Sequence, residues 1–192
     1  GWSSMARDGA VAVGDFDLDG VAEIVAVYNA NIYIVDSLTG TYTVFSADPA
    51  KSGGILGGGT PTVADFDGDG LPEIGIAFNV KYAVFEVDGT EVWSHVINDT
   101  SSQRTGSSVF DFEGDGVADV VFADQDNLYI FNGQTGVNRL DSVGKGFVDG
   151  TEHHSDTLFE YPTLADIDGD GSTEIILASR DTTATEWTGV RS

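Results

Sequence analysis

The feature that most constrains the fold of this chain is an acidic motif that occurs four times. In each copy an apolar segment precedes the pattern D-x-[DE]-x-D-G-x-x-[DE], and a second apolar segment follows it. The copies lie at residues 11–27, 62–77, 108–123 and 163–178. The first aspartate of each motif follows the previous one by 50, 46 and 55 residues. Self-similarity at this period predicts an array of similar structural units.

The segments that follow each motif also recur. Third apolar segments lie at residues 31–37, 81–89 and 127–133, and fourth ones at residues 41–46, 91–97 and 137–143. Apolar and polar residues alternate in these segments with the period of a half-buried β-strand, and no stretch sustains the period of an α-helix. The sequence therefore predicts an all-β chain in which each unit is a four-stranded antiparallel sheet. Radial repetition of such sheets at this period is typical of a β-propeller.

The chain is predicted to be a single β-propeller fragment of about four blades. The blades are expected at approximately residues 9–46, 58–97, 105–143 and 160–192. The fourth unit reaches only a third strand, around residues 186–192, and residues 1–5 resemble the end of a fourth strand. We therefore expect a fragment of a larger ring. An irregular β-sandwich with acidic hairpin loops is the alternative, but it does not explain one loop at the same point of four strand pairs.

Charge and composition exclude several classes of function. The 192 residues include 32 acidic and 8 basic side chains, which gives a formal net charge of −24. A chain this acidic repels nucleic acid and anionic membranes, so neither is expected as a partner. Cysteine is absent, which excludes disulfides, thiolate catalysis and cysteine-ligated zinc. No apolar run is long enough for a membrane-spanning helix, so membrane insertion is not expected.

Each motif concentrates four carboxylates in one short loop, and they repel one another unless they are protonated or neutralised. Ca²⁺ prefers a shell of oxygen ligands, whereas Mg²⁺ needs a smaller octahedral shell with retained water. We therefore predict four Ca²⁺ sites, with acidic side chains at positions 1, 3, 5 and 9 and a backbone carbonyl at position 7. The predicted ligands are Asp15, Asp17, Asp19, Val21 and Glu23; Asp65, Asp67, Asp69, Leu71 and Glu73; Asp111, Glu113, Asp115, Val117 and Asp119; and Asp166, Asp168, Asp170, Ser172 and Glu174.

The motif differs from an EF-hand and from a plain acidic turn. An EF-hand needs a glutamate at position 12 and flanking helices, whereas position 12 here is Ala26, Ile76, Phe122 or Leu177 and the flanks are predicted strands. The alternative for every loop is a solvated acidic turn without metal. The third loop departs from the others, because it has Glu113 at position 3 and Asp119 at position 9.

These motifs resemble the FG-GAP and VCBS-type repeats, the calcium-loop blades of integrin α-subunit propellers and of many bacterial surface proteins. The FG and GAP tripeptides are missing, as residues 28–30 and 78–80 show, which favours the bacterial variety. The resemblance implies a ring of seven blades, with the calcium loops between the first and second strands on one face. It also implies that ligands bind on the opposite face.

The resemblance favours a secreted or cell-surface, calcium-stabilised module for adhesion or for recognition of a protein or glycan. The partners would be a ligand on the face opposite the calcium loops and the remaining blades of the same or another chain. No Ser-His-Asp arrangement can be argued from three histidines, so a non-catalytic role is favoured. A propeller scaffold of a polysaccharide lyase or other carbohydrate-active enzyme is one alternative. A structural repeat of a large surface or filament protein is the other.

Candidate ligand contacts lie in the turns and connections expected on the opposite face. The longest connection, residues 144–161, contains Glu152, His153, His154 and Asp156. A pair of histidines beside acidic residues suits a transition-metal site or a general base. Neighbours on an extended chain point in opposite directions, however, which favours an exposed polar loop. The aromatic residues that suit stacking on a sugar ring, as well as packing between blades, are Tyr28, Tyr82, Trp93, Tyr161 and Trp187.

Overall fold

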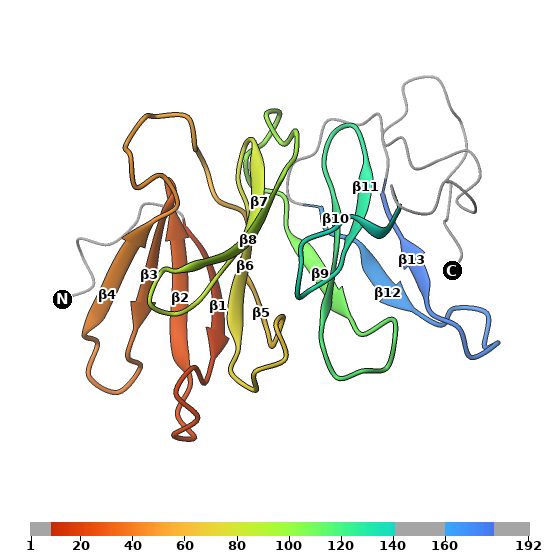
Figure 1. The fold of residues 1–192 in the computed structure, drawn as a ribbon, viewed down its shortest axis with the longest axis horizontal. Helices are drawn as coiled ribbons and strands as arrows, with labels where there is room; N and C mark the ends of the chain where they lie inside the picture. The colour runs from red at the N-terminus through yellow and green to blue at the C-terminus, as the bar shows by residue number, and fades with distance from the viewer. Residues whose placement is uncertain (1–8, 141–159, 179–192) are drawn as a thin grey trace.

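A computed structural model describes residues 9–140 and 160–178, which form thirteen β-strands in four antiparallel sheets (Figure 1). The first sheet contains β1 (Ala10–Gly14), β2 (Glu23–Tyr28), β3 (Asn31–Val35) and β4 (Tyr42–Ser46). The second contains β5 (Thr62–Ala64), β6 (Glu73–Ala77), β7 (Lys81–Phe85) and β8 (Glu91–Val96). The third contains β9 (Ser107–Phe110), β10 (Asp119–Ala123) and β11 (Leu128–Phe131), and the fourth contains β12 (Thr163–Ala165) and β13 (Glu174–Ile176).

Neighbours along the chain pair within each sheet, as in a meander. The predicted all-β chain of antiparallel sheets is therefore confirmed. The sheets stand side by side in an open row, and the described residues do not close a ring (Figure 1). Within the same residues, no helix is long and apolar enough to cross a membrane.

The hydrophobic core lies between successive sheets. The cluster between the first and second sheets includes Val25, Val27, Ile32, Ile34, Ile74, Ile76 and Phe85. A second cluster joins the second sheet to the third, and a third cluster joins the third sheet to the fourth. Every residue of β6 and of β10 is buried. These two strands are buried on both faces because the second and third sheets each have a neighbour on both sides.

The sheets also meet along their first strands. β1 contacts β5, β5 contacts β9, and β9 contacts β12. Thr62 of β5 and Ser107 of β9 share a hydrogen bond of 2.6 Å between their hydroxyl oxygens. Ser108 of β9 donates its hydroxyl to the carbonyl oxygen of Pro162, next to β12. The first strands of successive sheets therefore lie next to one another along the row.

The fourth strand predicted at residues 137–143 is not formed in the described part of that range. Asn138 makes a single bridge with Phe131, and residues 139 and 140 form a helical turn. The Asn138 side-chain oxygen accepts hydrogen bonds from the backbone N–H groups of Ile130 and Leu140, at 3.3 and 3.2 Å. The Asn138 side chain thus takes the place of the backbone carbonyl oxygens that would accept hydrogen bonds in a β-ladder. Residues 141–143, the strand predicted around 186–192, and the 152–156 cluster lie outside the described residues.

Candidate metal centre

The four acidic loops join the first and second strands of the four sheets, and they lie together along one edge of the row (Figure 1). The glycine at motif position 6 has positive φ in every loop, namely +89° at Gly20, +92° at Gly70, +89° at Gly116 and +89° at Gly171. A Cβ atom would meet nothing within 4 Å at these positions. The motif therefore needs glycine for its backbone conformation and not for space.

The aspartate at position 1 organises each loop by accepting backbone hydrogen bonds. In the second loop Asp65 accepts the N–H groups of Gly68 at 2.7 Å and Gly70 at 3.0 Å. Asp69 at position 5 accepts the N–H of Leu71 at 2.8 Å. Asp15, Asp111 and Asp166 make the corresponding bond to their own position-6 glycine, at 2.9, 2.8 and 3.0 Å. The backbone N–H groups of each loop thus hold the carboxylates at positions 1 and 5 in place.

The second loop brings all four of its carboxylates together. Asp65, Asp67, Asp69 and Glu73 each offer one oxygen, and these oxygens lie within 4.8 Å of one another. Glu73 is 0% exposed. Its Oε2 accepts the N–H groups of Phe66 at 2.6 Å and Asp67 at 3.2 Å, whereas its buried Oε1 has no hydrogen-bond partner.

Burial raises the pKa of Glu73 to about 7, and the neighbouring Asp67 adds to the rise while the two backbone N–H groups oppose it. A buried carboxylate oxygen without a partner, beside three further carboxylates, is the arrangement that a hard cation would neutralise. The residues of the second loop therefore fit a Ca²⁺ ion.

The first and fourth loops form smaller groups. Asp15, Asp17 and Asp19 come together in the first, and Asp166, Asp168 and Glu174 in the fourth. The position-9 glutamates use the same backbone contact as Glu73. Glu23 accepts the N–H of Phe16 at 3.0 Å, and Glu174 accepts the N–H of Ile167 at 2.7 Å. Two predicted ligands do not join these groups, namely Glu23 in the first loop and Asp170 in the fourth.

The position-7 residues take part in the turn through their N–H groups. Val21, Leu71, Val117 and Ser172 each donate to the position-5 aspartate, at 2.8, 2.8, 3.0 and 2.8 Å. Their carbonyl oxygens remain predicted ligands.

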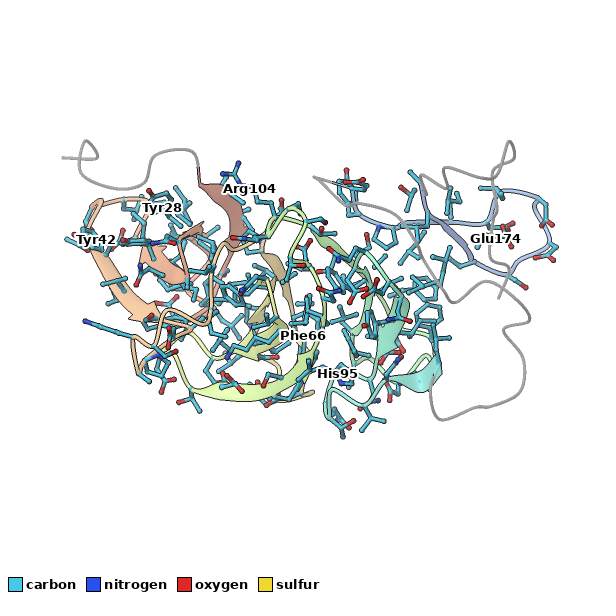
Figure 2. All side chains as sticks on the ribbon, turned by 90° about the horizontal axis from the view of Figure 1, so that it is seen from above. Tyr28, Tyr42, Phe66, His95, Arg104 and Glu174 are labelled. Carbon is cyan, nitrogen blue, oxygen red and sulfur yellow. The ribbon has the colours of Figure 1, made fainter. Side chains whose placement is uncertain are left out.

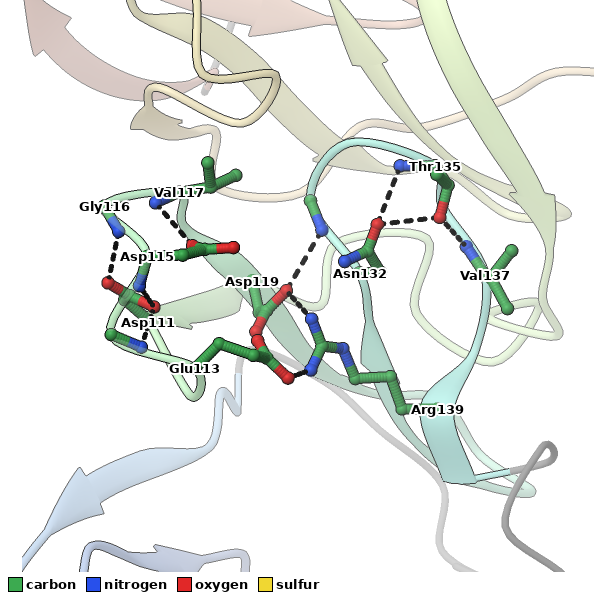
Figure 3. A network of polar contacts seen from close by, with 12 residues as sticks. Asp111, Glu113, Asp115, Gly116, Val117, Asp119, Asn132, Thr135, Val137 and Arg139 are labelled. Carbon is green, nitrogen blue, oxygen red and sulfur yellow. Dashed lines mark hydrogen bonds and ion pairs between the residues drawn. The ribbon is translucent and has the colours of Figure 1, made fainter.

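The third loop is built differently, because a cation of the protein itself enters it (Figure 3). Arg139 Nη2 lies 2.8 Å from Asp119 Oδ1, and Nη1 pairs with Glu113. Asp119 also accepts the N–H of Gly133 at 3.1 Å. Burial raises the pKa of Asp119 above its usual range. Sequence reasoning missed Arg139, although a basic residue among only eight in the chain is a signal that could have drawn attention to it.

The opposite edge of the row contains a cavity of about 460 Å³. Its lining comes from the turn after β2 and from the connections that lead to β5 and β9, and Figure 2 shows Tyr28 and Arg104 at this edge. The lining residues are Val27, Tyr28, Asn29, Gly57, Gly58, Ser102, Gln103 and Arg104. Tyr28 is 38% exposed there, whereas Tyr82 and Trp93 are buried between sheets.

The fold and the loops define an all-β repeat protein with an acidic loop in each unit. Residues 15–76 match the family model of the FG-GAP-like repeat. This match confirms the resemblance over a segment that contains the first two acidic loops. No curated protein matches the chain.

Solved structures are similar to the chain at low sequence identity. The structure of BBS1N in complex with ARL6DN has a TM-score of 0.54 and 12% identity, over 92% of this chain and 52% of that one. The V. cholerae biofilm matrix protein Bap1 has a TM-score of 0.49 and 19% identity, over 90% of this chain and 31% of that one. The chain thus spans about a third and about half of these neighbours. The likeness to BBS1N supports a shared fold.

Proposed function

We propose that the chain is a calcium-stabilised segment of an extracellular β-propeller that recognises a protein or glycan. The observation that carries the proposal is the second loop, where buried Glu73 has an oxygen without a partner beside three aspartates. A divalent cation with a preference for oxygen satisfies that atom and removes the repulsion within the group. Ca²⁺ at the FG-GAP-like loops would stabilise the fold and supply no catalytic step.

The outer face of the first sheet supports the propeller. Val13, Ile24, Ala26 and Tyr33 stand 50 residues before Val63, Ile74, Ile76 and Ala83, which pack in the core between the first and second sheets. Unlike its equivalent Val63, Val13 is 64% exposed. The first sheet thus presents the apolar surface that the second sheet buries. A further sheet of the same kind, from this or another chain, would cover it as in a ring.

Calcium dependence of stability tests the metal part of the proposal. A site that binds only the folded state contributes about 2.7 kcal/mol when free Ca²⁺ exceeds Kd a hundredfold. Several such terms are comparable with the whole free energy of unfolding of a domain. We therefore expect the melting temperature to fall on chelation, to recover with Ca²⁺, and to recover less with Mg²⁺. A melting temperature that does not respond to chelator would contradict the proposal.

The cavity at the edge opposite the loops is the proposed ligand site. Tyr28 offers an exposed ring and Asn29, Ser102 and Gln103 offer polar groups, a combination that suits a sugar. The test is a panel of glycans and polysaccharides in Ca²⁺ and in chelator, with mass spectrometry of the supernatant. Retention without cleavage, lost in Tyr28→Ala, supports recognition. Release of unsaturated sugars would instead identify the chain as the scaffold of a lyase. If no glycan is retained, the chain has a structural role.

A further inference from the structure

We propose that Arg139 neutralises the third acidic loop in place of a metal ion, so that this loop, unlike the others, does not bind Ca²⁺. The inference rests on the proposed calcium binding of the first, second and fourth loops. It assigns the third loop a different chemistry, with a guanidinium group as its resident cation.

The contacts of Arg139 occupy two of the four acidic positions that a metal ion would use. The guanidinium pairs with Glu113 at motif position 3 and with Asp119 at position 9. Its planar group can donate to two carboxylates at once, which a point charge on a flexible stem does less well. The Asp119 side chain is only 2% exposed, so the bond of 2.8 Å to Arg139 is shielded from water. Figure 3 shows the guanidinium facing both acidic side chains from one side.

Three changes from the other loops occur together in this unit. Position 3 is Glu113, whereas the other loops have aspartate there. Position 9 is Asp119, whereas the other loops have glutamate. In the first and second units, β4 and β8 follow the third strand and contain no lysine or arginine, whereas Arg139 follows β11 here. A longer side chain at one position and a shorter one at the other suit a cation that enters from the side of β11.

The backbone of the third loop is also satisfied without an ion. Asp111 accepts the N–H groups of Gly114, Asp115 and Gly116 at 2.7, 3.1 and 2.8 Å. Asp115 accepts the N–H of Val117 at 3.0 Å. The turn therefore has the shape of the others, while Glu113 and Asp119 Oδ1 pair with Arg139. Asp119 Oδ2 is buried without a hydrogen-bond partner, so in this loop the charge of Asp119 is balanced by the guanidinium through Oδ1 alone. For an ion to bind, Arg139 would have to leave two carboxylates, one of them buried.

Native mass spectrometry and calorimetry of the whole chain under Ca²⁺ titration test the inference. We expect three ions in the wild type and four in Arg139→Gln, with three in the control Lys51→Gln, which removes a positive charge from an exposed residue outside the acidic loops. The gain of one ion is specific to this inference. No ion in the wild type would contradict the proposed function, and no gain in Arg139→Gln would contradict the role of Arg139.

A second pair of variants keeps the test decisive if Arg139→Gln does not fold. Asp69→Asn and Asp115→Asn change the same motif position in the second and third loops. We expect Asp69→Asn to bind one ion fewer than the wild type, and Asp115→Asn to bind as many as the wild type. Loss of an ion in Asp115→Asn would show that the third loop holds a metal and would overturn the inference.

Discussion

Replacement of Glu73 by glutamine should have opposite effects on stability with and without calcium. Glu73 is buried, and its pKa is raised from 4.5 to about 7 in the folded protein. The folded state therefore binds its proton more tightly than the unfolded state. Without metal, the contribution of Glu73 to stability is fully present below about pH 4.5 and is lost as the pH rises through about 7, because the buried group must then ionise.

The size of this loss follows from the shift. One pKa unit corresponds to about 1.4 kcal/mol, so the shift from 4.5 to about 7 means that ionised Glu73 destabilises the metal-free protein by roughly 3–4 kcal/mol above pH 7. Glutamine keeps an oxygen that can accept the N–H of Phe66 and removes the charge. In chelator at pH 8, Glu73→Gln should therefore be more stable than the wild type by about this amount. In excess Ca²⁺ it should be less stable, because a charged ligand is lost.

Urea unfolding at pH 5 and pH 8, in chelator and in Ca²⁺, measures both effects. Asp88→Asn is the matched control, because Asp88 lies in the turn between β7 and β8, outside the acidic loops, and accepts the N–H of Thr90. The control should show no change of sign between the two conditions. If Glu73→Gln is less stable than the wild type in chelator at pH 8, the reasoning about its buried charge is wrong.

Two further substitutions test the turn and the core. Gly70→Ala places a Cβ at φ +92°, a conformation that L-residues rarely adopt, and should lower the free energy of unfolding by about 1–2 kcal/mol and weaken one Ca²⁺ site; urea unfolding and calorimetry would measure this, and an unchanged midpoint would refute it. Phe122→Ala removes a fully buried ring from the cluster between the second and third sheets and should cost about 3–5 kcal/mol, whereas exposed Val96→Ala should change stability little.

The sequence predicted the strands and the loops well because both have local patterns. The alternation of residues 31–35 and the glycine at position 6 depend only on neighbours in the chain, and the structure places β3 and the positive-φ turns there. The strand predicted at residues 137–143 was wrong over its described part, residues 137–140. There the Asn138 side chain competes for the backbone N–H groups that a strand would pair.

Contacts between segments far apart in the chain leave no local pattern in the sequence. Arg139 reaches Glu113 across 26 positions of the chain, and the cavity is lined by residues near 28, 57 and 103. From sequence alone, packing between blades was the favoured role for Tyr28, Tyr82 and Trp93, with sugar contacts as the alternative. The structure buries Tyr82 and Trp93 and leaves Tyr28 exposed. Their roles depend on which sheet faces meet, and that is a property of the assembled row.

The contacts between first strands have a consequence for how such a chain can change in evolution. Each sheet contacts the next through the same edge and the same apolar faces, from β1 to β5, β5 to β9 and β9 to β12. Because every junction uses the same kind of contact, the junctions of such an array do not depend on how many units it contains. Duplication or deletion of a whole unit therefore leaves every remaining junction intact, and the spacing of 50, 46 and 55 residues between motifs shows that the connections absorb differences in length.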